Sequence, residues 1–372
     1  MILGKLRGLL IFLLAGMCAV AQSPVERAVT LAREKRYAEA RQALNGVPEP
    51  VDTRQRIAFH RLRAAIASGL GEAAGAANEM EAALQIAPSD GGLLLATAVA
   101  ESEAGRFDEA VRHAGAVSGA AAQALVGDIQ EKRGRYVEAA KAYQAAVAGA
   151  PGNEQYRIAL ALELVQHHTF QAAELVLQQA VQLFPRSARI RTLLGLAQYG
   201  QDREDEALEN LVTAVALDPN LQPAQQYLIR IALESAGPPP EGVADAVCRH
   251  DVVACGAIQL RIARVQRDDG LTKTAIANLQ KGRPDNAVSR CELGRAYQWA
   301  EKWAAARTEM EACVRLDETP QNHYRLGLIY GRLGLADRAR EEMELRSQAE
   351  QRLSEEAGRK ASAIQAFEYV VK

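Results

Sequence analysis

The sequence predicts an all-α protein, a solenoid of repeated helical hairpins. Three prolines, Pro151, Pro185 and Pro219, stand 34 residues apart. Apolar residues make up 48% of the chain but aromatic residues only 5%, so small and aliphatic side chains dominate, and alanine favours helices. A chain of 372 residues exceeds what one compact core usually holds, which makes an array of repeats the first hypothesis.

Small residues recur in the same 34-residue spacing as the prolines. They form three columns: Gly127, Ala161 and Gly195; Ala139, Ala173 and Ala207; Ala146, Ala180 and Ala214. Two helices of a hairpin cross closely only if small residues face each other, and proline then ends the second helix. We therefore predict three consecutive hairpins, 120–153, 154–187 and 188–221.

The pattern continues less regularly towards both ends. Downstream, Gly294 with Ala306 and Gly327 with Ala339 repeat the two small columns, whereas Pro238–Pro239–Pro240 interrupts the array. The predicted order is a signal peptide (1–21), degenerate N-terminal repeats (22–119), a core array with one following helix (120–236), a proline-marked corner with a divergent repeat (237–286), a C-terminal pair of repeats (287–353) and the continuation of a capping helix (354–372).

Residues from about 337 to 370 predict one amphipathic helix. An apolar stripe runs along it through Leu345, Ala349, Leu353, Ala357, Ala361 and Ile364. Such a helix can cover the apolar edge of the final repeat, as the end of an array requires. A dimerising coiled coil is the alternative.

The columns together resemble the tetratricopeptide repeat family, whose W-L-G-Y…A…F…A…P pattern they follow. The match is specific in residues 120–221 and looser elsewhere. The resemblance implies a right-handed superhelix whose concave groove is lined by the first helix of each hairpin. It also implies a binding scaffold rather than an enzyme.

The N-terminus has the three-part layout of a secretory signal of the bacterial type. Lys5 and Arg7 precede an apolar stretch, and the small residues Ala19 and Ala21 follow it, so we expect cleavage after Ala21 and export to the periplasm or the medium. An uncleaved membrane anchor is the alternative, although the apolar run is shorter than the roughly 20 residues of a span. Loss of Lys5 and Arg7 leaves 42 cationic and 46 acidic residues, about −4.

Four cysteines remain after the predicted cleavage site. Cys291 and Cys313 lie near opposite ends of two antiparallel helices, which makes them plausible neighbours. Cys248 and Cys255 would lie about 10 Å apart on a continuous helix, beyond the ~7 Å reach of a disulfide. They can pair only if the helix breaks between them, with Asp251 capping the next helix. Zinc is the alternative, but the chain has no CxxC motif.

Charge and motifs argue against several classes of function. With 44 basic and 46 acidic residues, the chain lacks the cationic surplus that nucleic acid or an anionic membrane surface attracts. The glycine-rich segment 69–75 is interpreted as a hairpin turn, and His167–His168 as a helix end. The sequence has no HExxH motif and no supported catalytic triad, so we expect no catalytic residue, no cofactor and no metal.

The predicted groove changes character along its length. Its middle is apolar and its C-terminal part is cationic, which fits a peptide with an apolar and an acidic segment. The residues expected there are Asp128, Ile158, Leu162, Val165, Arg189, Thr192, Leu196, Tyr199, Arg230, Glu234, Arg295, Gln298, Trp299, Tyr324 and Arg332. Alternatively, these side chains only stack neighbouring first helices. The Lys and Asn residues with which chaperone-binding relatives hold a C-terminal carboxylate are absent.

Two functions from different classes follow. The first is a periplasmic or cell-envelope adaptor that binds a protein or peptide in the groove. The second is a repeat protein that recognises a glycan or peptidoglycan. Sugar-binding sites use aromatic side chains, and the chain has only two tryptophans and few aromatic residues. The partner's identity and the oligomeric state stay open.

Overall fold

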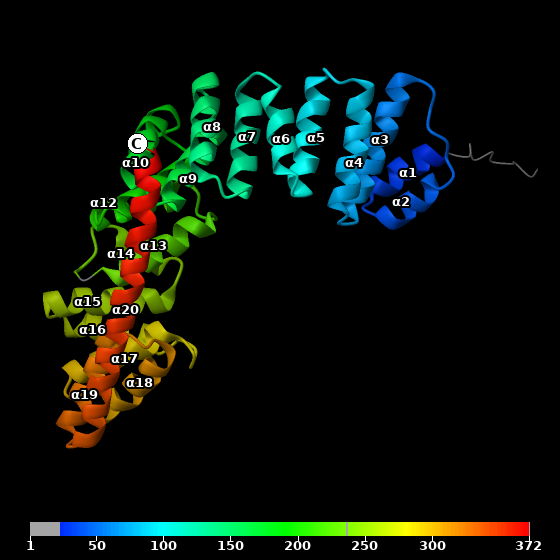
Figure 1. The fold of residues 1–372 in the computed structure, drawn as a ribbon. Coiled ribbons are helices and arrows are strands. Elements are labelled where there is room, and N and C mark those ends of the chain that lie inside the picture. Colours follow the sequence, from blue (N-terminus) through cyan, green and yellow to red (C-terminus); the bar gives the residue numbers. More distant parts are fainter. Residues whose placement is uncertain (1–22, 236, 372) are drawn as a thin grey trace, which may run out of the picture. The chain divides into compact units, whose positions relative to one another are not determined.

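A computed structural model describes residues 23–235 and 237–371 of the chain (Figure 1). This described part contains twenty α-helices and no strand, so the predicted all-α solenoid is confirmed. The chain divides into two compact units, Met1–Ser118 and Gly119–Lys372. The predicted signal and its cleavage site at Ala21 lie outside the described residues.

The first unit contains three helical hairpins in which each helix packs on the next. Its helices are α1 (Pro24–Arg33), α2 (Tyr37–Leu44), α3 (Thr53–Gly69), α4 (Ala73–Ile86), α5 (Gly91–Glu103) and α6 (Phe107–Gly115). A core of small residues, including the fully buried Ala77 and Ala83, joins α4 to its neighbours.

The second unit continues the hairpins and ends in a long helix. Its helices are α7 (Ala120–Lys132), α8 (Tyr136–Gly149), α9 (Glu154–Gln166), α10 (Phe170–Leu183), α11 (Ala188–Tyr199), α12 (Glu204–Leu217), α13 (Gln222–Glu234), α14 (Val243–Cys248), α15 (Val252–Gln266), α16 (Asp269–Leu279), α17 (Ala287–Trp299), α18 (Trp303–Leu316), α19 (Pro320–Arg332) and α20 (Ala336–Val371). From α9 to α17 each first helix also contacts the first helix of the next hairpin.

The two helices of a hairpin cross most closely where the sequence places its small residues. Ala161, Ala173 and Ala207 are fully buried at these crossings. A Cβ atom on Gly195 would lie 2.9 Å from the Ala207 carbonyl oxygen and 3.1 Å from Leu211 Cγ. The small residues that recur every 34 positions are therefore required by the short distance between the two helix axes.

The hairpin α15/α16 obeys the same limit with a different spacing. A Cβ atom on Gly256 would lie 2.8 Å from the carbonyl oxygen of Ala275. These residues are 19 apart, whereas Gly195 and Ala207 are 12 apart. Because α15 extends further before its turn, the close approach lies nearer its start, and the pattern between 222 and 284 looks broken in sequence.

The hairpin turns other than the one between α13 and α14 use one backbone device. A residue one to three positions after the first helix adopts a left-handed conformation, and the next N–H donates to a carbonyl five residues back, as Arg203 does to Gln198 at 3.1 Å. Glycine fills this position at Gly71 and Gly334, but Asp202 and Glu301 also accept it, so composition alone does not mark every turn. The motif fixes the angle at which the second helix leaves the first.

Polar clasps also join the two helices of five hairpins. Each links residues that are 19 apart in sequence: His60–Glu79 (2.8 Å), Arg191–Asn210 (2.9 Å), Gln259–Asn278 (3.0 Å), Arg290–Glu309 (2.7 Å) and His323–Glu342 (2.7 Å). The residue types vary while the spacing stays, so no repeated residue type marks the clasp in the sequence. It satisfies half-buried polar groups and fixes the register of the crossing.

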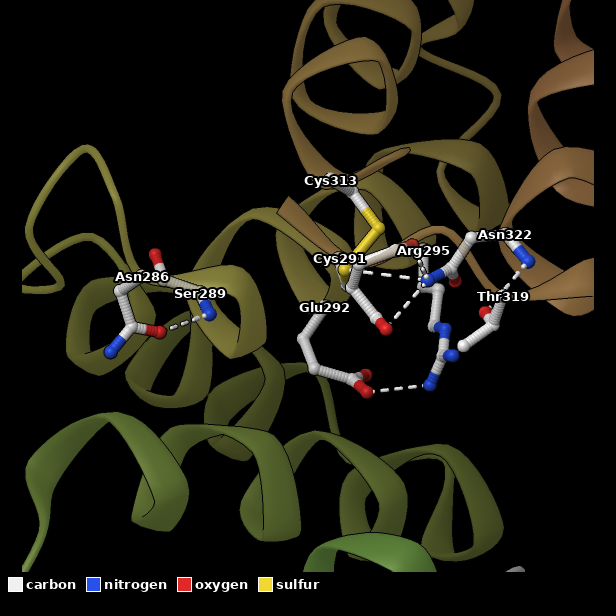
Figure 2. Close-up of a disulfide and its surroundings, with 9 residues drawn as sticks. Asn286, Ser289, Cys291, Glu292, Arg295, Cys313, Thr319 and Asn322 are labelled. Atoms are coloured by element: carbon white, nitrogen blue, oxygen red, sulfur yellow. Dashed lines mark hydrogen bonds and ion pairs between the residues drawn. A yellow bond between two sulfur atoms is a disulfide. The ribbon is translucent and has the colours of Figure 1, made fainter. Parts of the chain in front are cut away.

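Two disulfides lie in the last third of the chain. Helix α14 ends at Cys248, and Asp251 starts α15 by accepting the N–H groups of Val253 and Ala254. This helix break brings the Cα atoms of Cys248 and Cys255 to 4.5 Å, as pairing required. The second disulfide, Cys291–Cys313, joins α17 to α18 with a Cα separation of 4.7 Å (Figure 2).

The C-terminal helix α20 is both the partner of α19 and the end of the array. Its first part packs against α19, and Ala349 is only 3% exposed. Leu345 and Leu353 stay 36% and 54% exposed, so the predicted stripe is covered in part. The side chains of Ala357, Ala361 and Ile364 lie outside the described residues.

Overpacking one crossing tests the hairpin geometry. Ala173→Leu should lower the free energy of unfolding by roughly 1–3 kcal/mol, because the extra carbons have no space between α9 and α10. Ala172→Leu, the same change at the exposed neighbouring position, should stay within about 0.5 kcal/mol. Urea unfolding of both variants measures the difference. Equal losses would place the crossing elsewhere.

Peptide mapping without reduction tests the disulfides. Trypsin should release peptides 291–295 and 308–315 as one linked species, and 231–249 and 250–261 as another. Replacing Cys291 and Cys313 by serine should lower the free energy of unfolding by roughly 2–4 kcal/mol. Without the disulfide the unfolded chain gains conformational entropy, because its loop is no longer closed. Four free thiols in protein purified under oxidising conditions would contradict both bridges.

Candidate functional site

The candidate site is the first-helix face, formed by the side chains of α9, α11, α13, α15, α17 and α19 that point away from the second helices. In its apolar middle, Leu162 is 40% exposed. Ile158, Val165 and Leu196 are half-buried against the core cluster around α9 to α11. Leu162 is therefore free for a ligand, whereas the other three mainly stack the helices.

Tyr199 is engaged within the protein. Its hydroxyl donates a hydrogen bond to Glu234 on α13, and this bond raises the pKa of Tyr199 to about 12. The ring packs against the core formed by α12 to α14. Arg230 lies over the ring of Tyr227, 4.7 Å from its centroid. Tyr199 thus joins α11 to α13 and offers a ligand less surface than expected.

Thr192 is buried and donates to the Ala188 carbonyl, so it serves its own helix. Asp128 accepts a hydrogen bond from Tyr143 at 2.8 Å, and Arg189 remains exposed. Arg332, at the end of α19, lies 5.7 Å from the ring centroid of Trp303, the first residue of α18. Its guanidinium therefore sits towards a second helix, at the hairpin edge.

The C-terminal part of the face holds the remaining predicted residues. Arg295 donates to Glu292 at 2.6 Å (Figure 2), and Gln298 is half-buried one turn further along α17. The ring of Trp299 carries the guanidinium of Arg264 at 4.3 Å. Tyr324 is 41% exposed on α19.

Three arginines of this face were missed in the sequence: Arg261, Arg264 and Arg325. Their hairpins carry the irregular spacing around α15, so no column pointed to them. A usable signal was Arg264, which has an arginine, Arg295, 31 residues further along the chain. Burial and the nearby Arg295 lower the pKa of Arg325, and burial also lowers the pKa of Arg261.

One titratable cluster lies away from this face, at the turn between α9 and α10. Glu163 is only 1% exposed, and neither of its carboxylate oxygens accepts a hydrogen bond. Burial, with a smaller contribution from Glu131, raises the pKa of Glu163 to about 7. His167 lies 3.6 Å away and stacks on Tyr136, and burial lowers its pKa. A substrate cannot reach a carboxyl this enclosed, so we assign the cluster to structure.

Within 23–235 and 237–371, no group of three or more His, Cys, Asp or Glu side chains could hold a metal ion. None of the helices in this part combines the length and the apolarity of a membrane span.

Comparison with known proteins gives the family. The model of the tetratricopeptide repeat matches residues 95–154 and 158–221, which include the regular columns described above. These matched residues, about a third of the chain, are tetratricopeptide repeats. Such a fold is generally a non-enzymatic interaction scaffold.

Solved structures with related folds share little sequence with the chain. YrrB, a TPR protein with an unusual peptide-binding site, is 17% identical over 50% of this chain and 95% of its own, with a TM-score of 0.38. The C-terminal part of a TPR protein from Cytophaga hutchinsonii is 15% identical over 79% and 95%, with a TM-score of 0.44. A tetratricopeptide repeat protein from Parabacteroides merdae is 12% identical over 78% of this chain and 98% of its own, with a TM-score of 0.40. None of the curated proteins matches the sequence.

The buried Glu163 predicts a pH dependence of stability. Its folded pKa of about 7 lies above the ordinary 4.5, so the fold favours the protonated form and stability falls as pH rises between these values. Glu163→Gln should be more stable than the parent by roughly 1–3 kcal/mol at pH 8 and nearly equal at pH 4.5. Urea unfolding at both pH values, with the exposed Glu138→Gln as control, measures this. A gain that does not change with pH would refute the assignment.

Proposed function

We propose that this protein is an adaptor of the bacterial periplasm or cell envelope that binds a protein or peptide on its first-helix face. One observation carries the proposal: large apolar side chains are exposed on the first helices. Leu162, Tyr324 and Leu328 are 40%, 41% and 39% exposed. Tyr324 and Leu328 stand one turn apart on α19, and neighbouring exposed apolar side chains commonly mark a site for another macromolecule.

Export is proposed from the covalent chemistry of the chain. The N-terminal segment has the layout of a cleaved signal, with Ala19 and Ala21 before Gln22. The cysteines that follow it form two disulfides in the structure. Disulfides persist in oxidising compartments and are rare in the cytosol, which supports export.

Glycan or peptidoglycan recognition is the alternative function. Such a site needs open aromatic faces against which sugar rings can stack. On this surface the ring of Trp299 already carries the guanidinium of Arg264, and the ring of Tyr324 carries that of Arg346 at 5.0 Å. The aromatic faces are thus occupied in part, and a protein ligand is favoured.

Matched leucine variants test the binding face. The mature chain, beginning at Gln22, is used to capture partners from an envelope extract, and calorimetry then measures their affinity. Leu162→Ala on α9 should weaken binding by roughly 1–2 kcal/mol, because it removes exposed apolar surface from the contact. Leu175→Ala on the second helix α10, at a position 61% exposed, should change it little.

The outcomes separate the possibilities. If Leu175→Ala weakens binding and Leu162→Ala does not, the partner uses the second helices and the proposed face is wrong. Captured material that resists protease but is removed by glycan-degrading enzymes would favour the alternative function. Recovery of an uncleaved chain that still begins at Met1 would refute the proposed cleavage.

A further inference from the structure

Three consecutive first helices gather cationic side chains on one surface. Helix α15 supplies Arg261 and Arg264, α17 supplies Arg295, and α19 supplies Arg325. Glu292 pairs with Arg295 (Figure 2), and its charge also acts on Arg261 and Arg325. We call Arg264, Arg295 and Arg325 the arginine cluster. Arg261 is not part of it but joins α15 to the end of α13.

The arginine cluster lacks enough anionic partners. Among the described residues no ion pair joins Arg264 or Arg325 to a carboxylate, although other surface arginines of the chain have one. Arg295 uses one nitrogen for Glu292, and its Nε is buried without a hydrogen-bond partner. Burial together with the nearby Arg295 and Arg264 lowers the pKa of Arg325, which shows that the charges disfavour one another. An anion placed among them would relieve this repulsion.

A pocket of about 430 Å³ adjoins the cluster between α15, α16 and α17. Its walls include Leu260, Arg264, Arg267, Asp269, Ala296 and Trp299. The stacking of Arg264 on Trp299, at 4.3 Å, orients the guanidinium at this wall. A planar guanidinium held in this way can bind a carboxylate through two parallel N–H groups.

The helices that carry the cluster are held rigidly. Arg261 donates to the carbonyl oxygens of Ala232 and Ser235 at the end of α13, so it anchors α15. The disulfide Cys291–Cys313 joins α17 to α18 one turn from Arg295 (Figure 2). A site whose helices are fixed in advance loses less entropy on binding.

We propose that Arg264, Arg295 and Arg325 bind the side-chain carboxylates of an acidic peptide segment, whose apolar residues contact Tyr324 and Leu328. This inference rests on the proposed function and names the chemistry of the ligand. Peptide is favoured because exposed apolar side chains stand beside the cations on α19, and a simple anion would leave them unused. Nucleic acid requires a longer cationic surface than three arginines in a chain of 44 basic and 46 acidic residues.

Fluorescence anisotropy with the full mature chain tests the proposal. The probe is a labelled peptide that alternates Leu pairs with Glu pairs and is amidated at its C-terminus. The matched probe carries Gln in place of Glu. The Glu peptide should bind, and the Gln peptide should bind at least about 10-fold more weakly, because it offers no charge to the guanidinium groups. Raising the salt concentration should weaken the Glu peptide alone.

Arginine variants then locate the site. Arg264→Gln and Arg325→Gln should each weaken binding of the Glu peptide by about 10-fold or more, and Arg325→Gln should not lower the melting temperature, because it removes a repelling charge. Arg332→Gln, at the exposed end of the same helix α19, is the matched control and should change it less than about 2-fold. Arg295→Lys should lose part of the affinity, since lysine keeps the charge without the planar fork.

Several results would overturn the inference. They are equal binding of the two peptides, no binding of the Glu peptide up to about 1 mM, or equal effects of Arg325→Gln and Arg332→Gln. Displacement of the peptide by inorganic phosphate at equal concentration would reduce the site to a general anion site. If a captured partner depends on Leu162 but not on the arginine cluster, the proposed function stands and this inference fails.

Discussion

The closest approach of the two helices within each hairpin is the constraint on which the rest of the structure depends. At the crossings, Ala173 and Ala207 are fully buried, and a Cβ atom on Gly195 would collide with the facing backbone. The crossing distance fixes how far each second helix stands from its first helix. It thereby determines which side chains of the first helix point into the next repeat and which are left outside.

The hairpin turn and the polar clasp make this crossing reproducible without a fixed residue type. The turn needs one left-handed residue, which glycine supplies at Gly334 and Asp202 supplies elsewhere. The clasp needs a donor and an acceptor 19 residues apart, whether His323 and Glu342 or Arg290 and Glu309. Both devices act through backbone geometry and spacing, so the chain diverges in composition while the array persists.

The first-helix face is the surface that the packing of the hairpins leaves available for binding. Its middle is mostly used for stacking first helices, with Leu162 as the exposed exception. Its C-terminal part instead holds cations near one another, and the disulfide Cys291–Cys313 joins α17, which carries Arg295, to α18. Repelling charges on a rigid surface are stabilised by a ligand that brings the opposite charge, and the acidic peptide is proposed for this reason.

The sequence by itself determined the class of fold, the hairpin boundaries of residues 120–221 and the small residues at their crossings, because steric limits repeat at a fixed period. It also showed that Cys248 and Cys255 could pair only if the helix breaks between them, because helix geometry sets the distance between residues seven apart. Tertiary structure alone decided that Tyr199 bonds to Glu234 and that Arg295 comes near enough to help lower the pKa of Arg325. Contacts between successive hairpins depend on how each hairpin rotates against the next, and no local pattern encodes this rotation.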